Sequence, residues 1–501
     1  MQRGKRAAVN TAVSFLEEFV SLICGFILPR LILAAFGSKY NGLTLSISQF
    51  LSCAVLLRSG IGGATRAALY KPLATHNQDE INSIVKATDI FMKKIGVVLL
   101  GAILFFAVLY PCFVKNEFGW FFTFSLYVII GASTFAESFF GITYLIVLQA
   151  DQRLWISSLF KSICYILNTS IAAILIYNNF SIHAVKLGSA VIYVIYPIVL
   201  GLYVRRHYHI DTHVKPNNAA IAQRWDAFWQ QVAYFVMNNT DIMVLTVFSN
   251  MLEVSVYSVY NLVINGIKKT VQSFTNGLEA AFGNMIARKE EKALSQNVGI
   301  IEIMLYSLST IVCTCSAILI LDFVKLYTHN VTDVEYIRPA FAYTILLAQF
   351  FSTIRLPYQL VVQAAGHYKQ TKIGAIIEPI INIALSIAFV YKFGLIGVAV
   401  GTLVATIFRT IQYSIYMSKN LVHRSIWVVV SKILLCFVEA AAIFTIVWRL
   451  NLPSAGNYFS WFCNACVTFL ISCLVVMLGN IVFFKNDTVN MLKKLKNIVR
   501  K

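Results

Sequence analysis

The chain has 501 residues, of which 58% are hydrophobic and only 13% are charged, and its mean hydropathy is +0.72. Soluble domains are about one quarter charged, and a soluble fold of this length could not bury so much apolar surface, so the composition excludes a soluble protein. The formal net charge of +19 suggests nucleic acid binding, but its distribution along the chain, described below, excludes that function.

Long apolar runs predict about 14 membrane-spanning helices. A helix needs about 20 apolar residues to cross a hydrocarbon core about 30 Å thick. Strands of a membrane barrel would alternate apolar and polar residues, whereas these runs are continuous. We therefore expect an all-α, polytopic membrane protein. In chain order, the predicted spans are 12–35, 43–57, 95–113, 121–148, 156–177, 184–203, 228–248, 254–283, 298–321, 339–362, 373–391, 395–417, 427–448 and 460–484.

The first span follows Arg3, Lys5 and Arg6, as the apolar part of a signal peptide would. The run is too long for a signal peptide, contains Glu17 and Glu18, and lacks a small-residue cleavage site, so we expect a retained helix. An even number of spans places both termini on one side, and most of the 41 Lys and Arg residues fall on that side. The positive-inside rule makes that side the cytoplasm, and nucleic acid is not expected as a partner.

Three short segments recur at nearly one offset. They are the segments around Gln149 and Gln363, which are 214 residues apart, those around Gly188 and Gly401, which are 213 apart, and residues 38–41 and 255–258, which are 217 apart. Many transporters are built from internal repeats. We expect a duplicated six-helix unit, and because six is even, an axis along the membrane normal should relate the two copies.

The repeat predicts a domain organisation. We expect a six-helix bundle in 1–203, a cytoplasmic linker in 204–227, a second six-helix bundle in 228–417, and two additional helices with a basic cytoplasmic tail in 418–501. The ten cysteines lie mostly within spans, where packing is their expected role. One CxxC pair, Cys463 and Cys466, has neither a second pair nor a soluble fold around it, so we expect no metal and no cofactor.

Two amphipathic stretches flank the spans. One has apolar residues at Ile81, Ile84, Val85 and Phe91, and the other lies in the basic tail 491–501. We expect both to lie on the membrane surface, where the lysines of the tail would suit anionic lipid head groups.

Ionisable residues within a span are costly and are therefore functional candidates. Arg30 in the first span and Asp241 in the seventh lie at similar depth in helices that the repeat makes equivalent. One interpretation is a gate or charge relay that closes the outer side. The other is that Arg30 extends to the interface and that hydrogen bonds from nearby asparagines hold Asp241.

Two adjacent lysines, Lys268 and Lys269, lie in the eighth span. Consecutive helical residues point about 100° apart, so at most one of them faces a central cleft squarely. A cationic cleft would suit a diphosphate. Alternatively, the helix leaves the bilayer early and both lysines lie at the cytoplasmic face.

Arg355 and Glu378 lie at similar depth in neighbouring spans, where they can form a buried ion pair, either structural or part of a gate. Glu17 and Glu18 in the first span leave a similar choice, because a carboxylate lining a cleft can be protonated in a coupled cycle. We interpret the remaining intramembrane charges as contacts within the bundles; they are Glu137, Lys161, Glu302 and Glu439.

Several segments carry a family resemblance: Asn10, the stretch 31–43 with Phe36-Gly37-Ser38-Lys39-Tyr40-Asn41-Gly42, the run Asn239-Thr240-Asp241, and residues 253–258. With the repeat, they resemble the polysaccharide-export branch of the multidrug/oligosaccharidyl-lipid/polysaccharide exporter superfamily, which includes Wzx-type O-antigen and capsule flippases. The resemblance implies translocation of undecaprenyl-diphosphate-linked oligosaccharide repeat units across the bacterial inner membrane by alternating access. It implies the lipid-linked oligosaccharide and membrane lipids as partners, and a polysaccharide polymerase and chain-length machinery as protein partners.

Under this interpretation, Arg30 and one of Lys268 or Lys269 hold the diphosphate, because burying a dianion without cations is prohibitive. An alternative within the superfamily is a cation-coupled multidrug or metabolite exporter, which should present unpaired carboxylates to organic cations. A membrane enzyme is not expected, because the longest outer loop is only 322–338 and the chain has no DxD pair, HExxH motif or Walker loop. We therefore expect no catalytic residues.

Overall fold

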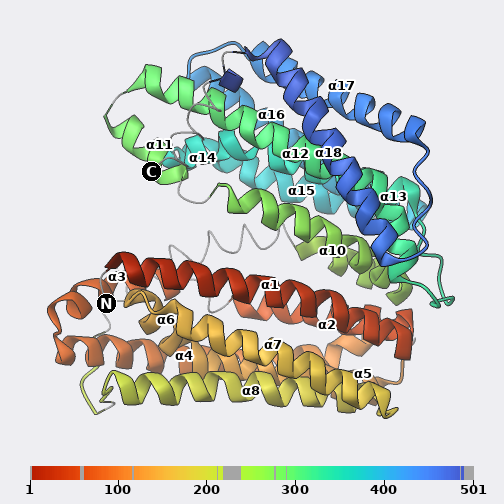
Figure 1. Ribbon diagram of the computed structural model, residues 1–501. Helices are drawn as coiled ribbons and strands as arrows, with labels where there is room; N and C mark the ends of the chain where they lie inside the picture. The colour runs from red at the N-terminus through yellow and green to blue at the C-terminus, as the bar shows by residue number, and fades with distance from the viewer. Residues whose placement is uncertain are drawn as a thin grey trace. The chain divides into compact units, whose positions relative to one another are not determined.

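The computed structural model describes residues 3–56, 61–114, 118–211, 213–217, 239–275, 278–288, 290–485 and 487–489. These residues form helices and turns without a strand, which confirms the predicted all-α fold (Figure 1). The chain divides into two compact units, Met1–Ser255 and Val256–Lys501. The predicted basic tail 491–501 and most of the predicted linker and seventh span, residues 218–238, lie outside the described residues.

The first unit consists of long helices joined by short turns. Its elements are α1 (Arg3–Phe36), α2 (Ser38–Val55), α3 (Ile61–Thr75), α4 (Gln78–Phe113), α5 (Trp120–Ala136), the π-helical turn η2 (Glu137–Gly141), α6 (Ile142–Ala150), α7 (Leu154–Tyr177), α8 (Ile182–His207), the short apolar helix Asn239–Phe248 and the first residues of α10 (Met251–Ser273).

The second unit begins within α10 and has the same helical character. Its further elements are α11 (Leu278–Ala287), α12 (Glu291–Tyr327), α13 (Pro339–Ile354), α14 (Leu356–Ala364), α15 (Tyr368–Phe393), α16 (Leu395–Asn420), α17 (Trp427–Leu450) and α18 (Tyr458–Phe483).

Eleven helices among the described residues are long and apolar enough to cross a membrane. Two predicted spans are interrupted in the structure. The predicted span 254–283 is α10 and α11, separated by a turn at Phe274 and Thr275. The predicted span 339–362 is α13 and α14, which meet at Arg355 because Pro357 cannot donate a backbone hydrogen bond to a continuous helix.

The amphipathic stretch 81–91 is not a surface helix, and the expectation of membrane docking was wrong. It forms the first part of α4, which runs without interruption into the predicted span 95–113. Ile81, Ile84 and Val85 are buried in a core cluster with α6 and α8 residues such as Leu148 and Leu200. The apolar face that the sequence indicates is real, but protein covers it.

The predicted repeat has a counterpart in two tight turns. After α6, Asp151 N donates to Val147 O, and after α14, Ala365 N donates to Val361 O. Gln152 (φ 56°) and Gly366 (φ 68°) occupy the left-handed position of these turns, and they lie 214 residues apart, as the sequence offset requires. This shared geometry supports the duplication.

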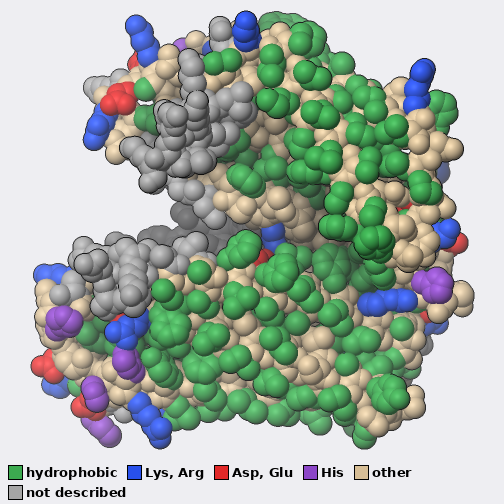
Figure 2. Space-filling model, in the orientation of Figure 1, with side chains coloured by type: hydrophobic (Ala, Val, Ile, Leu, Met, Phe, Trp, Pro, Cys, Tyr) green, Lys and Arg blue, Asp and Glu red, His purple; other side chains and the backbone are tan. Residues whose placement is uncertain are grey.

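The outer surfaces of the helices are apolar. On the face shown in Figure 2, hydrophobic side chains cover the long helices of each unit. Phe105, Leu167, Val438 and Leu470 are examples of exposed side chains in the middle of long helices. Such a surface suits the hydrocarbon core of a bilayer.

Candidate functional site

The segments that carry the family resemblance meet in the first unit. Side chains of α2 bond to the segment 239–255: Gln49 Nε2 donates to Asn239 Oδ1 at 2.6 Å and Asn41 Nδ2 donates to Ser255 Oγ at 2.8 Å. Gly42 permits this approach, because an added Cβ would lie 1.9 Å from Met251 O. These residues therefore act in helix packing, as small and polar residues commonly do in membranes.

Asn10, the first of those residues, also has a structural partner. Its Nδ2 donates to Gln152 O at 2.7 Å, and its Oδ1 accepts from Trp155 N at 3.0 Å, so it joins α1 to the first turn of α7. In the same turn, Tyr208 donates to Asp151 Oδ2 at 2.6 Å, and burial together with this carboxylate raises the pKa of Tyr208.

Arg30 and Asp241 both lie in the first unit and are half-buried. Arg30 follows Pro29 in the second half of α1, and Asp241 lies at the start of the helix Asn239–Phe248. Their action as a gate remains a prediction.

The two α1 carboxylates differ in exposure: Glu17 is half-buried and Glu18 is exposed. Both charges act on Tyr165 of α7, whose hydroxyl is hydrogen-bonded to Ser21. Their role in coupling also remains a prediction.

The predicted Arg355–Glu378 ion pair is present in the second unit. Arg355 Nη1 lies 2.5 Å from Glu378 Oε1, and Arg409 Nε of α16 lies 3.4 Å from Glu378 Oε2. Arg409 also donates to Thr371 O at 3.1 Å and to the Tyr413 hydroxyl at 2.8 Å. Glu378 and Arg409 are each only 4% exposed, so the carboxylate is enclosed between two guanidinium groups.

The two lysines of α10 are separated by the turn of the helix, as expected. Lys268 is half-buried and the charge of Arg355 acts on it, whereas Lys269 is exposed. Lys268, Arg355 and Arg409 therefore bring three positive charges to one carboxylate, Glu378. This group, which we call the cationic cluster, has a net positive charge.

The sequence analysis missed Arg409. The signal was available, because Arg409 lies within the predicted span 395–417, and an arginine at membrane depth requires a partner. The partner, Glu378, had already been assigned to Arg355.

A second ion network in the same unit has a structural role. Glu302 of α12 is fully buried and pairs with Arg424, while Lys432 Nζ of α17 lies 2.9 Å from Glu302 Oε2 and 3.3 Å from Asp487 Oδ2. These bonds attach α17 and the segment after α18 to α12. Glu302 is thus a contact within the bundle, as predicted, although its partners were not.

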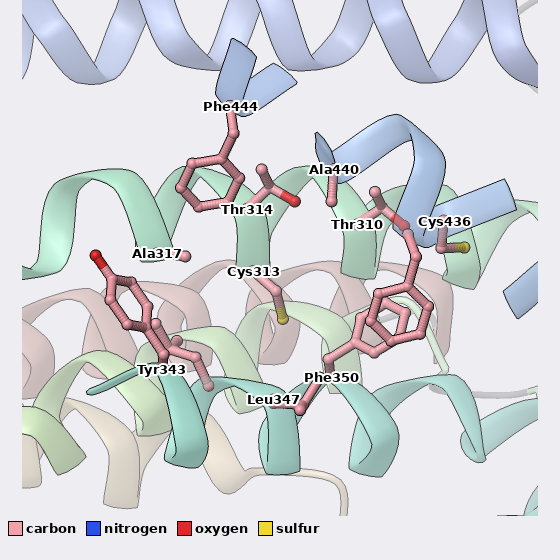
Figure 3. A pocket seen from close by; sticks show the side chains of 12 residues that line it. Thr310, Cys313, Thr314, Ala317, Tyr343, Leu347, Phe350, Cys436, Ala440 and Phe444 are labelled. Atoms are coloured by element: carbon pink, nitrogen blue, oxygen red, sulfur yellow. The ribbon is translucent and has the colours of Figure 1, made fainter. Parts of the chain in front are cut away.

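An apolar pocket of about 200 Å³ lies between α12, α13 and α17. Figure 3 shows the side chains of Tyr343, Phe350 and Phe444 around it, with the thiols of Cys313 and Cys436 in its wall. No Lys, Arg, Asp or Glu lines this pocket, so it is unsuited to a diphosphate. Among the described residues, no group of His, Cys, Asp and Glu side chains could hold a metal ion.

No protein-family model and no curated protein matches the chain, but solved structures share its fold. The lipid II flippase MurJ in an inward closed conformation aligns with a TM-score of 0.72 at 16% identity, over 95% of this chain and 99% of its own. An inward-facing MATE multidrug resistance transporter of the MOP superfamily aligns with a TM-score of 0.58 at 13% identity, over 83% of this chain and 98% of its own. A MATE transporter from Vibrio cholerae gives 0.57 at 14% identity, over 85% and 99%.

At these identities the likeness establishes the fold. The fold is that of polytopic flippases and transporters of the MOP superfamily, which confirms the predicted resemblance at this level. The solved structures named here are transport proteins and not enzymes.

Proposed function

We propose that this chain is a flippase that moves undecaprenyl-diphosphate-linked oligosaccharide repeat units across the bacterial inner membrane by alternating access, for O-antigen, capsule or exopolysaccharide synthesis. The observation that carries the proposal is the cationic cluster. A diphosphate loses its hydration when it enters the membrane, and charge-assisted hydrogen bonds from Arg and Lys compensate for that loss. Arg30 of the first unit is a further candidate ligand.

The fold comparisons support this choice over other transporters. The structure named a lipid II flippase is matched over 95% of this chain. The MATE transporter is matched over 83%, which leaves about one sixth of the chain, close to the length of the predicted appendage 418–501. A fold that includes the additional helices favours a lipid-linked substrate.

The adjacent lysines provide a test with a matched control. In vesicles containing the purified protein, Lys268→Ala should lower the rate of flipping of a polyprenyl-diphosphate-linked sugar at least tenfold, because a charge-assisted bond contributes about 1.5–3 kcal/mol. Lys269→Ala, on the exposed side of the same helix, should leave the rate within about twofold. Equal rates for both variants and the unmodified protein would contradict a substrate role for the cluster.

A second candidate is the cation-coupled exporter, which the carboxylates Glu17, Glu18 and Glu137 of the first unit favour. Vesicles with an imposed proton or sodium gradient distinguish the two. Uptake of ethidium without flipping of the lipid-linked sugar would support the exporter.

The proposal includes a location and an orientation. We infer a multi-pass inner-membrane protein with both termini in the cytoplasm, working beside a polysaccharide polymerase and chain-length machinery. A reporter inserted at Thr332, between α12 and α13, should then be outside the cytoplasm. The predicted division into bundles 1–203 and 228–417 with linker 204–227 belongs to the same proposal.

A further inference from the structure

The first unit contains a polar cavity that the diphosphate chemistry does not use. Its volume is about 220 Å³, and it lies between the end of α5, the π-helical turn η2, α7 and α8. The lining side chains are Ser133, Thr134, Glu137, Lys161, Cys164, Tyr165, Tyr193 and Tyr196. At about 30 Å³ per water molecule, the cavity has room for one small polar group.

The aromatic walls of this cavity are held in place by bonds outside it. The Tyr196 hydroxyl lies 2.8 Å from Ser157 Oγ, and Asn168 Nδ2 donates to the Tyr193 hydroxyl at 3.3 Å. The π-helical turn is fixed against α8, because an added Cβ at Gly141 would lie 2.7 Å from Pro197 Cβ. A preformed cavity with anchored aromatic rings is typical of a ligand site.

The polar groups in the wall carry opposite charges. Glu137 supplies a carboxylate that accepts hydrogen bonds, and Lys161 supplies an ammonium group that donates them. Among the described residues, none accepts a hydrogen bond from Lys161. Because one negative and one positive charge line the wall, the cavity favours a neutral group with several hydroxyls over an ion.

We propose that this cavity binds one sugar ring of the translocated glycan, with Glu137 and Lys161 bonded to its hydroxyls and the tyrosine rings packed on its apolar C–H face. The inference rests on the proposed function and adds a carbohydrate subsite in the first unit. Glu137 lies near the middle of the candidate span Trp120–Ala150, so the site is at membrane depth. Sugar hydroxyls at that depth need hydrogen-bond partners, because hydrocarbon provides none.

The experiment compares two probes in vesicles containing the full chain. One is polyprenyl diphosphate bearing a single N-acetylglucosamine, and the other is polyprenyl diphosphate without sugar. Lys161→Met should slow the sugar-bearing probe about tenfold and leave the sugar-free probe unchanged, because only the bonds to hydroxyls are lost. Tyr193→Phe, which keeps the ring, should retain most of the rate for both probes. Leu167→Ala, on the exposed side of α7, is the matched control.

A binding measurement separates this proposal from the function on which it rests. Saturation-transfer NMR of the protein in nanodiscs should detect free N-acetylglucosamine with the unmodified chain and lose at least three quarters of the signal with Lys161→Met. Equal slowing of both probes, or an unchanged NMR signal in Lys161→Met, would overturn the subsite while leaving the flippase intact. If the unmodified protein moves neither probe, the proposed function fails, and NMR binding that depends on Lys161 would still support a sugar site.

Discussion

In the first unit, the carboxylate of Glu137 borders an open cavity together with Lys161, whereas in the second unit the carboxylate of Glu378 is enclosed between Arg355 and Arg409. Both groups lie beside an irregularity of a helix pair. Gly141 ends the π-helical turn between α5 and α6, and Arg355 lies between α13 and α14, 214 residues later.

The repeat has therefore diverged at corresponding places. The second unit neutralises its own carboxylate and retains excess positive charge, which suits an anionic part of a substrate. The first unit keeps a carboxylate and an ammonium group in the wall of a cavity, which suits a neutral polar part. A substrate with a diphosphate and a sugar would use both kinds of site.

The largest expected effect distinguishes an enclosed carboxylate from an accessible one. Glu378→Gln leaves two guanidinium groups without their counter-ion, and breaking a buried ion pair from one side costs about 3–5 kcal/mol. Glu17→Gln, at a half-buried position of α1, should cost less than about 1 kcal/mol. Thermal unfolding in detergent, followed by size-exclusion chromatography, measures both.

The same pair of variants can show that Glu378 has a role in transport. If Glu378→Gln is as stable as the unmodified protein but no longer flips substrate, the ion pair is part of the gate and not a structural element. If both variants lose similar stability, the contrast between the two units is incorrect.

The second prediction compares repeat-related glycines. At Gly401, an added Cβ would lie 2.4 Å from Ser386 Oγ and 2.9 Å from its backbone nitrogen, whereas at Gly188 it would meet only side-chain ends of α7 at 3.2 Å. Gly401→Ala should therefore destabilise the protein by about 1–3 kcal/mol, the cost of overpacking. Gly188→Ala should change stability by less than about 1 kcal/mol, because alanine also favours the helix.

Unfolding of the two alanine variants in parallel checks this difference. Equal losses would mean that α8 approaches α7 as closely as α16 approaches α15. The repeat would then be more symmetric than the observed contacts indicate.

The features that followed from the sequence depend on local chemistry. The length of apolar runs predicted the helices, a shared offset predicted the turns at Gln152 and Gly366, and similar depth predicted the Arg355–Glu378 pair. The helix breaks at Phe274 and Arg355 were missed because an apolar run continues through them.

The missed residues depend on contacts that no local pattern encodes. Arg424 lies in a loop, and only the fold brings it to Glu302, 122 residues earlier. Similarly, the cavity around Glu137 requires the π-helical turn η2, which has no clear signature in its sequence Glu-Ser-Phe-Phe-Gly. Sequence reasoning found the charge at this position and interpreted it as a packing contact.

The smallest expected effects concern the two turns that mark the repeat. Gly366 has a left-handed backbone conformation, which costs an L-residue with a side chain about 1–2 kcal/mol, so Gly366→Ala should destabilise the protein by about 1 kcal/mol. Gln152 adopts the same conformation with a side chain present, so Gln152→Gly removes the local strain and should stabilise the protein slightly, by less than about 1 kcal/mol. Asn10 bonds to the backbone of Gln152, so the substitution keeps that contact. Changes of opposite sign in thermal unfolding would show that the turns are equivalent in backbone but not in side-chain strain. A loss of stability in Gln152→Gly would instead show that the glutamine side chain has a stabilising contact that Gly366 lacks.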